Sequence, residues 1–215
     1  IAGVSAADTN NTAIASEDTG EIELSASDDI SVNNLETNEN NTLTQANNEE
    51  PVSAQTDSEI LTDDQYTYSD LREQIGTGGN KNLIKGIYTY NNDGDTIKIT
   101  DSGVINGNGA IIDMAGFTKR AFEVTTSGVT FKNLTIKNAN YNGFGGAIEF
   151  ITSGSVENCN FVNNSATCGG AVFFYGNSDV TNCNFTDNTA SEGGGAIWFT
   201  SEGTVENCNF TNNTA

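Results

Sequence analysis

Residues 145–164 read GGAIEFITSGSVENCNFVNN, and the pattern returns at 169–188 as GGAVFFYGNSDVTNCNFTDN and at 194–213 as GGAIWFTSEGTVENCNFTNN. The copies begin 24 and then 25 residues apart. Each copy holds short segments in which apolar and polar residues alternate, separated by Gly, Asn and Ser. Alternation with a period of two predicts strands, and the residues between them predict turns. Three strands in each repeat predict one coil of a right-handed parallel β-helix, an all-β fold.

Degenerate copies extend the pattern toward the N-terminus. Phe122 and Val124 alternate in the same way that Ile148 and Phe150 do one repeat later. A single coil cannot close a core, so stability must come from stacking neighbouring coils. We therefore expect β-helix repeats over residues 93–215, truncated at the C-terminal end of the sequence.

The segment before the repeats predicts a cap for the open first coil. Thr67 to Ile75 has apolar residues spaced as on one face of a helix, and Gly76 follows as a stop residue. A Thr-x-x-Asp start is typical of a helix N-terminus. We expect residues 65–92 to form the N-terminal cap, with a short amphipathic helix inside it.

The first 64 residues have a different composition. Residues 1–64 contain 15 Asp and Glu and no Lys or Arg, and their apolar residues show no sustained period. Such a segment buries too little apolar surface to offset the entropy of ordering it, so we expect an acidic disordered arm. The tripeptide Val4-Ser5-Ala6 fits the small-x-small end of a secretory signal peptide. This remnant favours an extracellular protein at the cell surface.

The formal net charge of −21 disfavours two classes of partner. Binding to nucleic acid needs clustered Lys and Arg, and an anionic membrane surface attracts basic segments. The chain also has no run of 18 apolar residues, so we expect no direct membrane insertion in this segment.

Three of the four cysteines recur at one place in the repeat. Cys159, Cys183 and Cys208 share an inward column with Leu134, so we expect them to stack in the core. Cα atoms stacked ~4.8 Å apart fall within the disulfide range, but three residues in one column cannot all pair. We favour reduced thiols that act as small apolar side chains, with disulfides as the alternative. We expect no metal site, because the chain has no His and no CxxC-type spacing, and no cofactor.

The recurring asparagines have a structural interpretation and a modification interpretation. Stacked Asn side chains at a strand corner tolerate left-handed backbone and can hydrogen-bond along the column. We interpret one column as a structural Asn ladder: Asn133, Asn158, Asn182 and Asn207. Candidate N-glycosylation sites are the Asn-x-Ser/Thr sequons at Asn163, Asn184, Asn209 and Asn212.

The Gly-Gly-Ala-[Ile/Val] and Phe-x-x-Asn boxes resemble the repeats of polymorphic outer-membrane proteins. The segments YTYSDLR at 66–72 and INGNGAIID at 105–113 resemble the start of archaeal adhesin-like proteins. The resemblance covers about residues 66–215. It implies a secreted, repetitive protein that attaches to a glycan or surface protein of another cell. Independently of the resemblance, an uncovered last coil would expose unpaired strand edges, so self-association through open β-helix ends is a further expectation. The same fold hosts pectate-lyase-type enzymes, so the fold alone does not decide the function.

Catalytic chemistry finds little support in the sequence. With no His, Ser-His-Asp triads and His-metal sites are excluded. A β-helix lyase or glycosidase would need clustered outward carboxylates, and we expect Glu123, Glu149 and Glu157 to be scattered one per strand. We therefore predict that the protein is not an enzyme. A polysaccharide-active lyase or hydrolase and a purely structural cell-wall stalk remain the alternatives.

The outward aromatic residues are the candidate ligand-binding site. The central outward position of one strand per coil runs Lys98, Glu123, Glu149, Phe173 and Trp198. Phe173 and Trp198 are therefore expected to be exposed neighbours on adjacent coils, with Tyr175 close by. Flat exposed aromatics on a rigid sheet suit stacking against sugar rings or packing against a protein. A covering loop, a dimer contact and ordinary surface aromatics are the competing interpretations.

Overall fold

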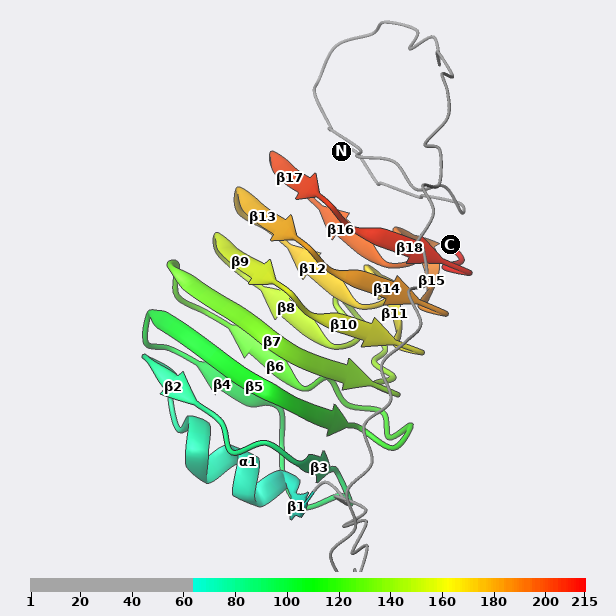
Figure 1. The fold of residues 1–215 in the computed structure, drawn as a ribbon. Coiled ribbons are helices and arrows are strands. Elements are labelled where there is room, and N and C mark those ends of the chain that lie inside the picture. Colours follow the sequence, from blue (N-terminus) through cyan, green and yellow to red (C-terminus); the bar gives the residue numbers. More distant parts are fainter. Residues whose placement is uncertain (1–63) are drawn as a thin grey trace, which may run out of the picture. The chain divides into compact units, whose positions relative to one another are not determined.

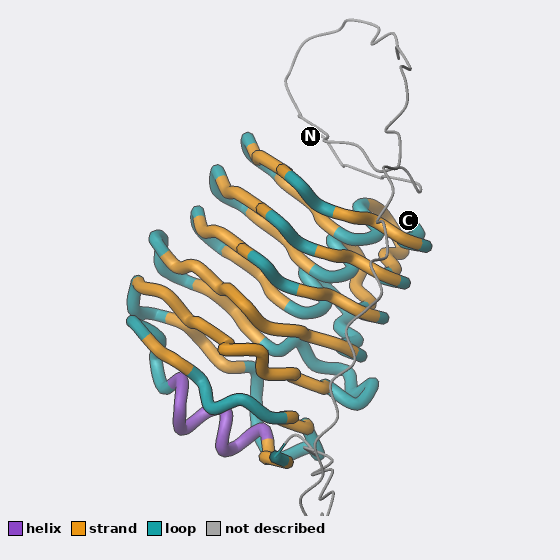
Figure 2. Tube along the Cα trace, in the orientation of Figure 1, coloured by secondary structure: helices purple, strands orange, loops and turns teal. Residues whose placement is uncertain are grey.

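The computed structural model describes residues 64–215, so the predicted arm, apart from its last residue, and the secretory remnant lie outside the described residues. Within them the chain winds into a stack of coils (Figures 1 and 2). Every pair of named strands in this part of the chain is parallel. The predicted all-β parallel β-helix with one short helix is confirmed.

One sheet takes a single three-residue strand from each of five coils. Its strands are β4 (Ile97–Ile99), β6 (Phe122–Val124), β8 (Ile148–Phe150), β12 (Val172–Phe174) and β16 (Ile197–Phe199). The first and third side chains of every strand are buried. Because side chains alternate along a strand, the central one faces away from the core.

A second sheet contains eleven strands. One row of it is β1 (Gln65–Thr67), β3 (Ile87–Thr89), β5 (Gly103–Asp113), β7 (Val129–Lys137), β10 (Asn160–Val162), β14 (Asn184–Thr186) and β18 (Asn209–Thr211). The other row adds β2 (Lys81–Asn82), β9 (Gly154–Glu157), β13 (Ser178–Thr181) and β17 (Gly203–Glu206). A third, two-stranded sheet pairs β11 (Ser165–Cys168) with β15 (Thr189–Gly193).

The predicted cap helix is α1 (Tyr68–Ile75), at the N-terminal end of the stack (Figure 1). The Thr67 side chain accepts a hydrogen bond from the backbone N–H of Asp70, and the Asp70 carboxylate accepts one from the backbone N–H of Thr67. This capping box satisfies two N–H groups that a helix start leaves free. The apolar face of α1 is fully buried against the first coils.

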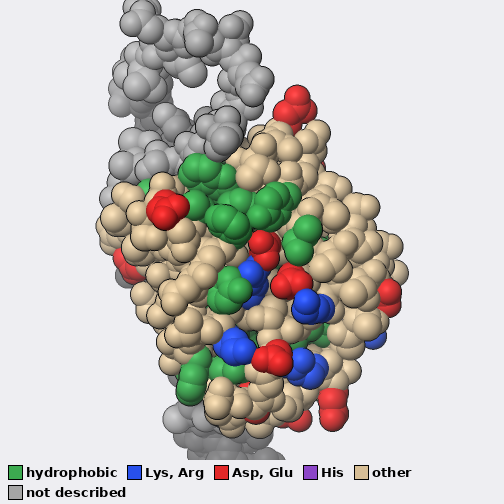
Figure 3. All heavy atoms as spheres, turned by 180° about the vertical axis from the view of Figure 1, so that it is seen from behind, with side chains coloured by type: hydrophobic (Ala, Val, Ile, Leu, Met, Phe, Trp, Pro, Cys, Tyr) green, Lys and Arg blue, Asp and Glu red, His purple; other side chains and the backbone are tan. Residues whose placement is uncertain are grey.

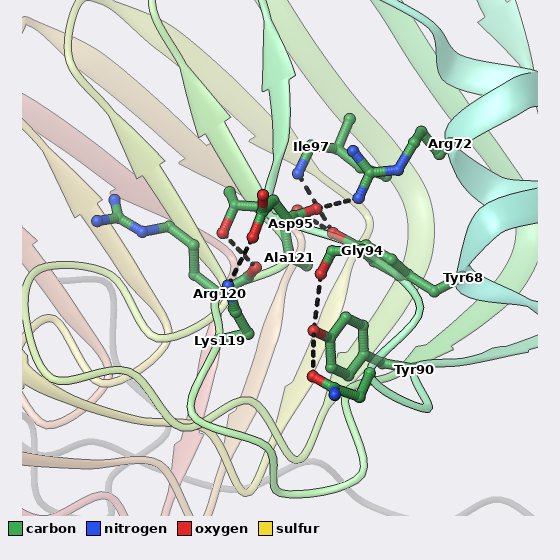
Figure 4. A network of polar contacts seen from close by, with 11 residues as sticks. Tyr68, Arg72, Tyr90, Gly94, Asp95, Ile97, Lys119, Arg120 and Ala121 are labelled. Carbon is green, nitrogen blue, oxygen red and sulfur yellow. Dashed lines mark hydrogen bonds and ion pairs between the residues drawn. The ribbon is translucent and has the colours of Figure 1, made fainter.

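Hydrogen bonds join this helix to the coils that follow it (Figure 4). The Tyr68 hydroxyl donates to the carbonyl of Ala121 at 2.6 Å and accepts from the backbone N–H of Ile97 at 3.3 Å. Burial raises the pKa of Tyr68, which keeps the hydroxyl protonated as a donor. Arg72 donates to the carbonyl of Asp95. The helix therefore contacts two successive coils and covers their apolar interior.

Aromatic side chains stack in files through the core. The rings of Phe150 and Phe174 lie 4.7 Å apart, and those of Phe174 and Phe199 lie 4.9 Å apart. Phe161, Phe185 and Phe210 form a second file at 5.0 and 5.1 Å. These distances match the spacing of parallel strands, so each coil presents the same shape to the next one. Burying one such side chain contributes roughly 1.5–3 kcal/mol.

The three recurring cysteines lie in one buried file, as the repeat predicts. The backbone N–H of Cys159 donates to the sulfur of Cys183 at 3.4 Å, and that of Cys183 donates to the sulfur of Cys208 at 3.3 Å. All four cysteines of the described residues are free thiols. The hydrogen bond with Cys159 raises the pKa of Cys183 to about 12. The hydrogen bond with Cys183 and burial also raise the pKa of Cys208, so Cys183 and Cys208 are neutral, poorly nucleophilic thiols at neutral pH.

The structure corrects the position of the amide ladder. Asn133, Asn158, Asn182 and Asn207 do adopt the predicted left-handed backbone, with φ between 51° and 55°. Among the described residues, however, no side-chain hydrogen bond joins Asn158 to Asn182 or Asn182 to Asn207, because these side chains face solvent.

The ladder runs instead through the asparagines that end the Phe-x-x-Asn boxes. The Nδ2 of Asn164 donates to Oδ1 of Asn188 at 3.0 Å, and Nδ2 of Asn188 donates to Oδ1 of Asn213 at 2.9 Å. Asn164 and Asn188 are fully buried, so their amides must find partners inside the coil.

Candidate functional site

The outward side of the five-stranded sheet, with the loops that border it, forms what we call the outer face. Its first column holds the central residue of each strand, in parallel register: Lys98, Glu123, Glu149, Phe173 and Trp198. A second column follows two residues later, where backbone hydrogen bonds continue the register: Thr100, Thr125, Ile151, Tyr175 and Thr200. The outer face is therefore charged or polar in its N-terminal coils and largely apolar in its C-terminal coils.

Ion pairs cover the N-terminal part of the outer face, which we call the charged half. Lys98 lies 3.0 Å from Glu123, and the side chain of Arg120 contacts that of Glu149. Lys119 lies 2.8 Å from Asp95, and this hydrogen bond lowers the pKa of Asp95. Figure 3, seen from behind relative to Figure 1, shows these basic and acidic side chains gathered beside a hydrophobic patch.

The Arg120–Glu149 pair is buried although it lies on an outward column. Their side chains are only 7% and 9% exposed. The guanidinium of Arg120 also lies 4.1 Å from the ring centre of Tyr141, a cation–π geometry. The loop that carries Tyr141 therefore covers the pair and shields it from water.

The acidic side chains are placed differently from the prediction. Glu123 and Glu149 are register neighbours on β6 and β8, so they are stacked rather than scattered. Only Glu157 lies apart, on β9 of the eleven-stranded sheet. The outward column read from the repeats already contains Glu123 and Glu149 as neighbours, so the interpretation of these two as scattered overlooked a signal that the sequence held.

The C-terminal part of the outer face carries what we call the outer patch: Phe144, Ile151, Phe173, Tyr175 and Trp198. Phe173 and Trp198 are register neighbours, as predicted. Phe173 is not exposed, however, because the rings of Phe144 and Tyr175 lie 4.6 and 4.8 Å from its ring. The exposed surface comes from Ile151, Phe144 and Tyr175, at 43%, 39% and 39%. The patch therefore has a buried aromatic base and an exposed apolar rim.

The loop at residues 138–147 holds Phe144 over the sheet. The backbone N–H of Thr167 donates to the carbonyl of Gly143 at 2.7 Å, and that of Gly145 donates to the carbonyl of Cys168 at 3.0 Å. Both bonds tie the loop to β11 in the next coil. The ring that covers Phe173 is thus fixed before any ligand arrives.

A glycine allows the Trp198 ring to lie flat beside β15. A Cβ added to Gly193 would lie 2.3 Å from the ring of Trp198, which is closer than carbon atoms can approach. Two exposed carboxylates lie nearby along the chain. Glu192 precedes Gly193, and Glu202 follows Ser201, whose hydroxyl donates to the carbonyl of Tyr175 at 2.9 Å.

Two members of the outer patch were missed in the sequence. Ile151 stands next to Tyr175 in a column whose other three residues are threonines, so its apolar character was a detectable signal. Phe144 lies in a loop of irregular length, and no periodicity predicts the direction of its side chain. Arg120 and Tyr141 were missed for the same reason.

The four candidate glycosylation residues lie on two parts of the eleven-stranded side. Asn184 and Asn209 are exposed on β14 and β18, and the amide of Asn209 donates to Oδ1 of Asn184 at 2.8 Å. Asn163 and Asn212 are exposed at turns with φ of 55° and 53°. Glycosylation at these residues stays a prediction.

Within residues 64–215 no group of three or more His, Cys, Asp or Glu side chains is arranged to hold a metal ion. No helix in this described part is both long and apolar enough to cross a membrane.

Comparison with known proteins supports the architecture. Residues 120–215 match the family model described as right handed beta helix region. No curated protein and no solved structure matches the chain. Together with the parallel stack of coils, the family match identifies right-handed β-helix repeats in this part of the chain. The resemblance to archaeal adhesin-like proteins stays a prediction.

Proposed function

We propose that these right-handed β-helix repeats form the binding scaffold of an exported, adhesin-like protein that attaches at the cell surface to glycans of other cells. The single observation that carries the proposal is the outer patch. Exposed aromatic and aliphatic side chains gather there on a rigid parallel sheet. Aromatic rings offer sugars a flat apolar surface, against which the C–H face of a pyranose ring can stack.

The fixed geometry of the patch supports a binding role. Phe144 is held by backbone hydrogen bonds to the next coil, and Trp198 lies against Gly193. Side chains that are already ordered lose little conformational entropy on binding. A shallow, weakly binding surface can then still retain a sugar chain, and repetition of sites on a cell would strengthen attachment.

The test measures binding of the wild-type chain and a Tyr175→Ala/Trp198→Ala variant to an array of neutral, amino and acidic oligosaccharides. We expect specific glycan binding by the wild type and a loss of about 10-fold or more in the variant. Stacking of a flat nucleic-acid base on an aromatic side chain is worth about 1–3 kcal/mol, and two rings are removed here. Ile84→Ala is the matched control, since Ile84 is exposed but lies in the N-terminal cap. Unchanged binding by the double variant would remove the patch from the proposal.

One observation favours a second candidate, a polysaccharide-active lyase or hydrolase. Glu123 and Glu149 are stacked on adjacent strands beside Lys98 and Arg120. Two neighbouring carboxylates are the usual machinery for glycoside cleavage. Against this role, both carboxylates are paired with bases, and Glu149 is buried, so neither is free to exchange a proton with a substrate. Turnover of a polysaccharide by the wild type, abolished by Glu149→Gln in a folded variant, would favour the enzyme.

A further inference from the structure

We propose that the outer patch selects glycans that carry free amino groups, such as chains of 2-amino-2-deoxy sugars. This inference rests on the proposed glycan-binding function and adds the charge of the ligand. It combines two independent features of the same surface, its exposed aromatic rings and the sign of the charges that surround them.

In the coils that carry the patch, every charged side chain is acidic. Residues 138–215 contain seven Asp and Glu and no Lys or Arg. In the charged half of the outer face, carboxylates pair with Lys98, Lys119 and Arg120. A ligand with carboxylate or sulfate groups would find no Lys or Arg in the coils that carry the patch and would be repelled by their charge.

Two exposed glutamates are the sequence neighbours of residues that contact the patch. Glu192 lies next to Gly193, on which the Trp198 ring rests. Glu202 lies next to Ser201, which is hydrogen-bonded to the backbone of Tyr175. Neither carboxylate is paired with a base, since residues 138–215 provide none.

An amino sugar satisfies both features at once. The C–H face of its ring can stack on Tyr175 or Trp198, while its ammonium group approaches the carboxylates at the rim. An ammonium group is also attracted to the face of an aromatic ring. A neutral sugar retains only the stacking contribution, and an acidic sugar meets repulsion. The expected order of affinity is therefore amino, then neutral, then acidic.

The experiment compares short oligomers of one length: glucosamine, N-acetylglucosamine and a uronic acid, each titrated into the full chain while the amines are protonated. We expect the glucosamine oligomer to bind about 5- to 10-fold more tightly than the acetylated one, since each exposed ion pair contributes little on its own. Raising the salt concentration should shrink this advantage, because exposed charges are screened.

A matched pair of variants locates the charge effect. Glu192→Gln/Glu202→Gln should reduce the preference for the amino oligomer over the acetylated one by about 3-fold or more. Glu157→Gln/Glu206→Gln removes the same charge from β9 and β17, on the other sheet, and should leave the preference intact.

Three results would overturn the inference. Equal affinity for the amino and acetylated oligomers would do so while leaving glycan binding in place. Amino-oligomer binding that survives Tyr175→Ala/Trp198→Ala would show diffuse attraction to an acidic chain instead of a site. Binding of none of the three oligomers would overturn both this inference and the proposed function.

Discussion

The inner and outer sides of the five-stranded sheet follow different rules. On the inner side the residues barely change from coil to coil, and Ile148, Val172 and Ile197 are all buried in one column. One residue further along each strand, the outer column passes from Glu149 to Phe173. The inner side has to fit the same neighbour in every coil, whereas the outer side does not. Architecture and surface chemistry can therefore vary independently in this molecule.

The largest expected effect on stability is in the aromatic file of Phe150, Phe174 and Phe199. Phe174 is fully buried between Phe150 and Phe199, so Phe174→Ala should lower the free energy of unfolding by about 3–5 kcal/mol. Ile151→Ala, in the outer patch at a 43% exposed side chain, should change it by less than about 1 kcal/mol. Urea denaturation followed by circular dichroism measures both. Similar losses in the two variants would contradict the division between inner and outer sides.

The second test concerns the outward pair that is nevertheless buried. Glu149→Ala leaves Arg120 without its carboxylate in a shielded site and should cost about 3 kcal/mol. Glu123→Ala breaks a pair whose lysine is 66% exposed and should cost about 1 kcal/mol at most. An Arg120→Met/Glu149→Leu variant removes both charges and should recover most of the loss. If the double variant stays as unstable as Glu149→Ala, the loss does not come from leaving Arg120 as an unpaired buried charge.

The third test compares the buried amide ladder with an exposed one, in which hydrogen bonds join the side chains of Asn160, Asn184 and Asn209. Asn188 is buried, and its Nδ2 donates to the carbonyl of Phe161 at 3.0 Å and to the next Asn. Asn188→Ala should cost about 2 kcal/mol, because it leaves buried backbone groups without partners. Asn184 lies in an exposed ladder, so Asn184→Ala should cost no more than about 0.5 kcal/mol. Equal denaturation midpoints for the two variants would contradict the assignment.

The smallest expected effect on stability concerns Asp70 in the capping box of α1. Hydrogen bonds from Thr67 lower the pKa of Asp70, so the ionised carboxylate favours the folded helix. This contribution is present above the usual Asp pKa of about 3.9 and is lost as the pH falls through the lower folded pKa. Asp70→Asn should therefore lower the denaturation midpoint slightly at pH 7. The difference from wild type should vanish in acid, and a difference that grows there would contradict this account.

The sequence predicted the inner side well and the outer side poorly. Repeats at 24 and 25 residues fix which positions stack, so the files of Cys159, Cys183 and Cys208 followed directly from them. Alternation also placed Phe173 and Trp198 outward, but it carries no information about what covers an outward residue. Phe173 is covered by Phe144, which comes from a loop without periodicity.

The position of the amide ladder was also outside the reach of the pattern. Both asparagine columns recur at the repeat length, and both were available in the sequence. The side chain of Asn188 turns into the coil, while that of Asn182 faces solvent. Local spacing does not encode that difference.

The register of the coils has a consequence for how such a chain can change over generations. Because the inner columns are alike from β8 to β16, a crossover between two misaligned gene copies would add or remove a whole coil and still yield a chain that folds. Each such event would shift the acidic and aromatic surfaces relative to one another by one strand spacing. Recombination would then diversify recognition while leaving the interior untouched.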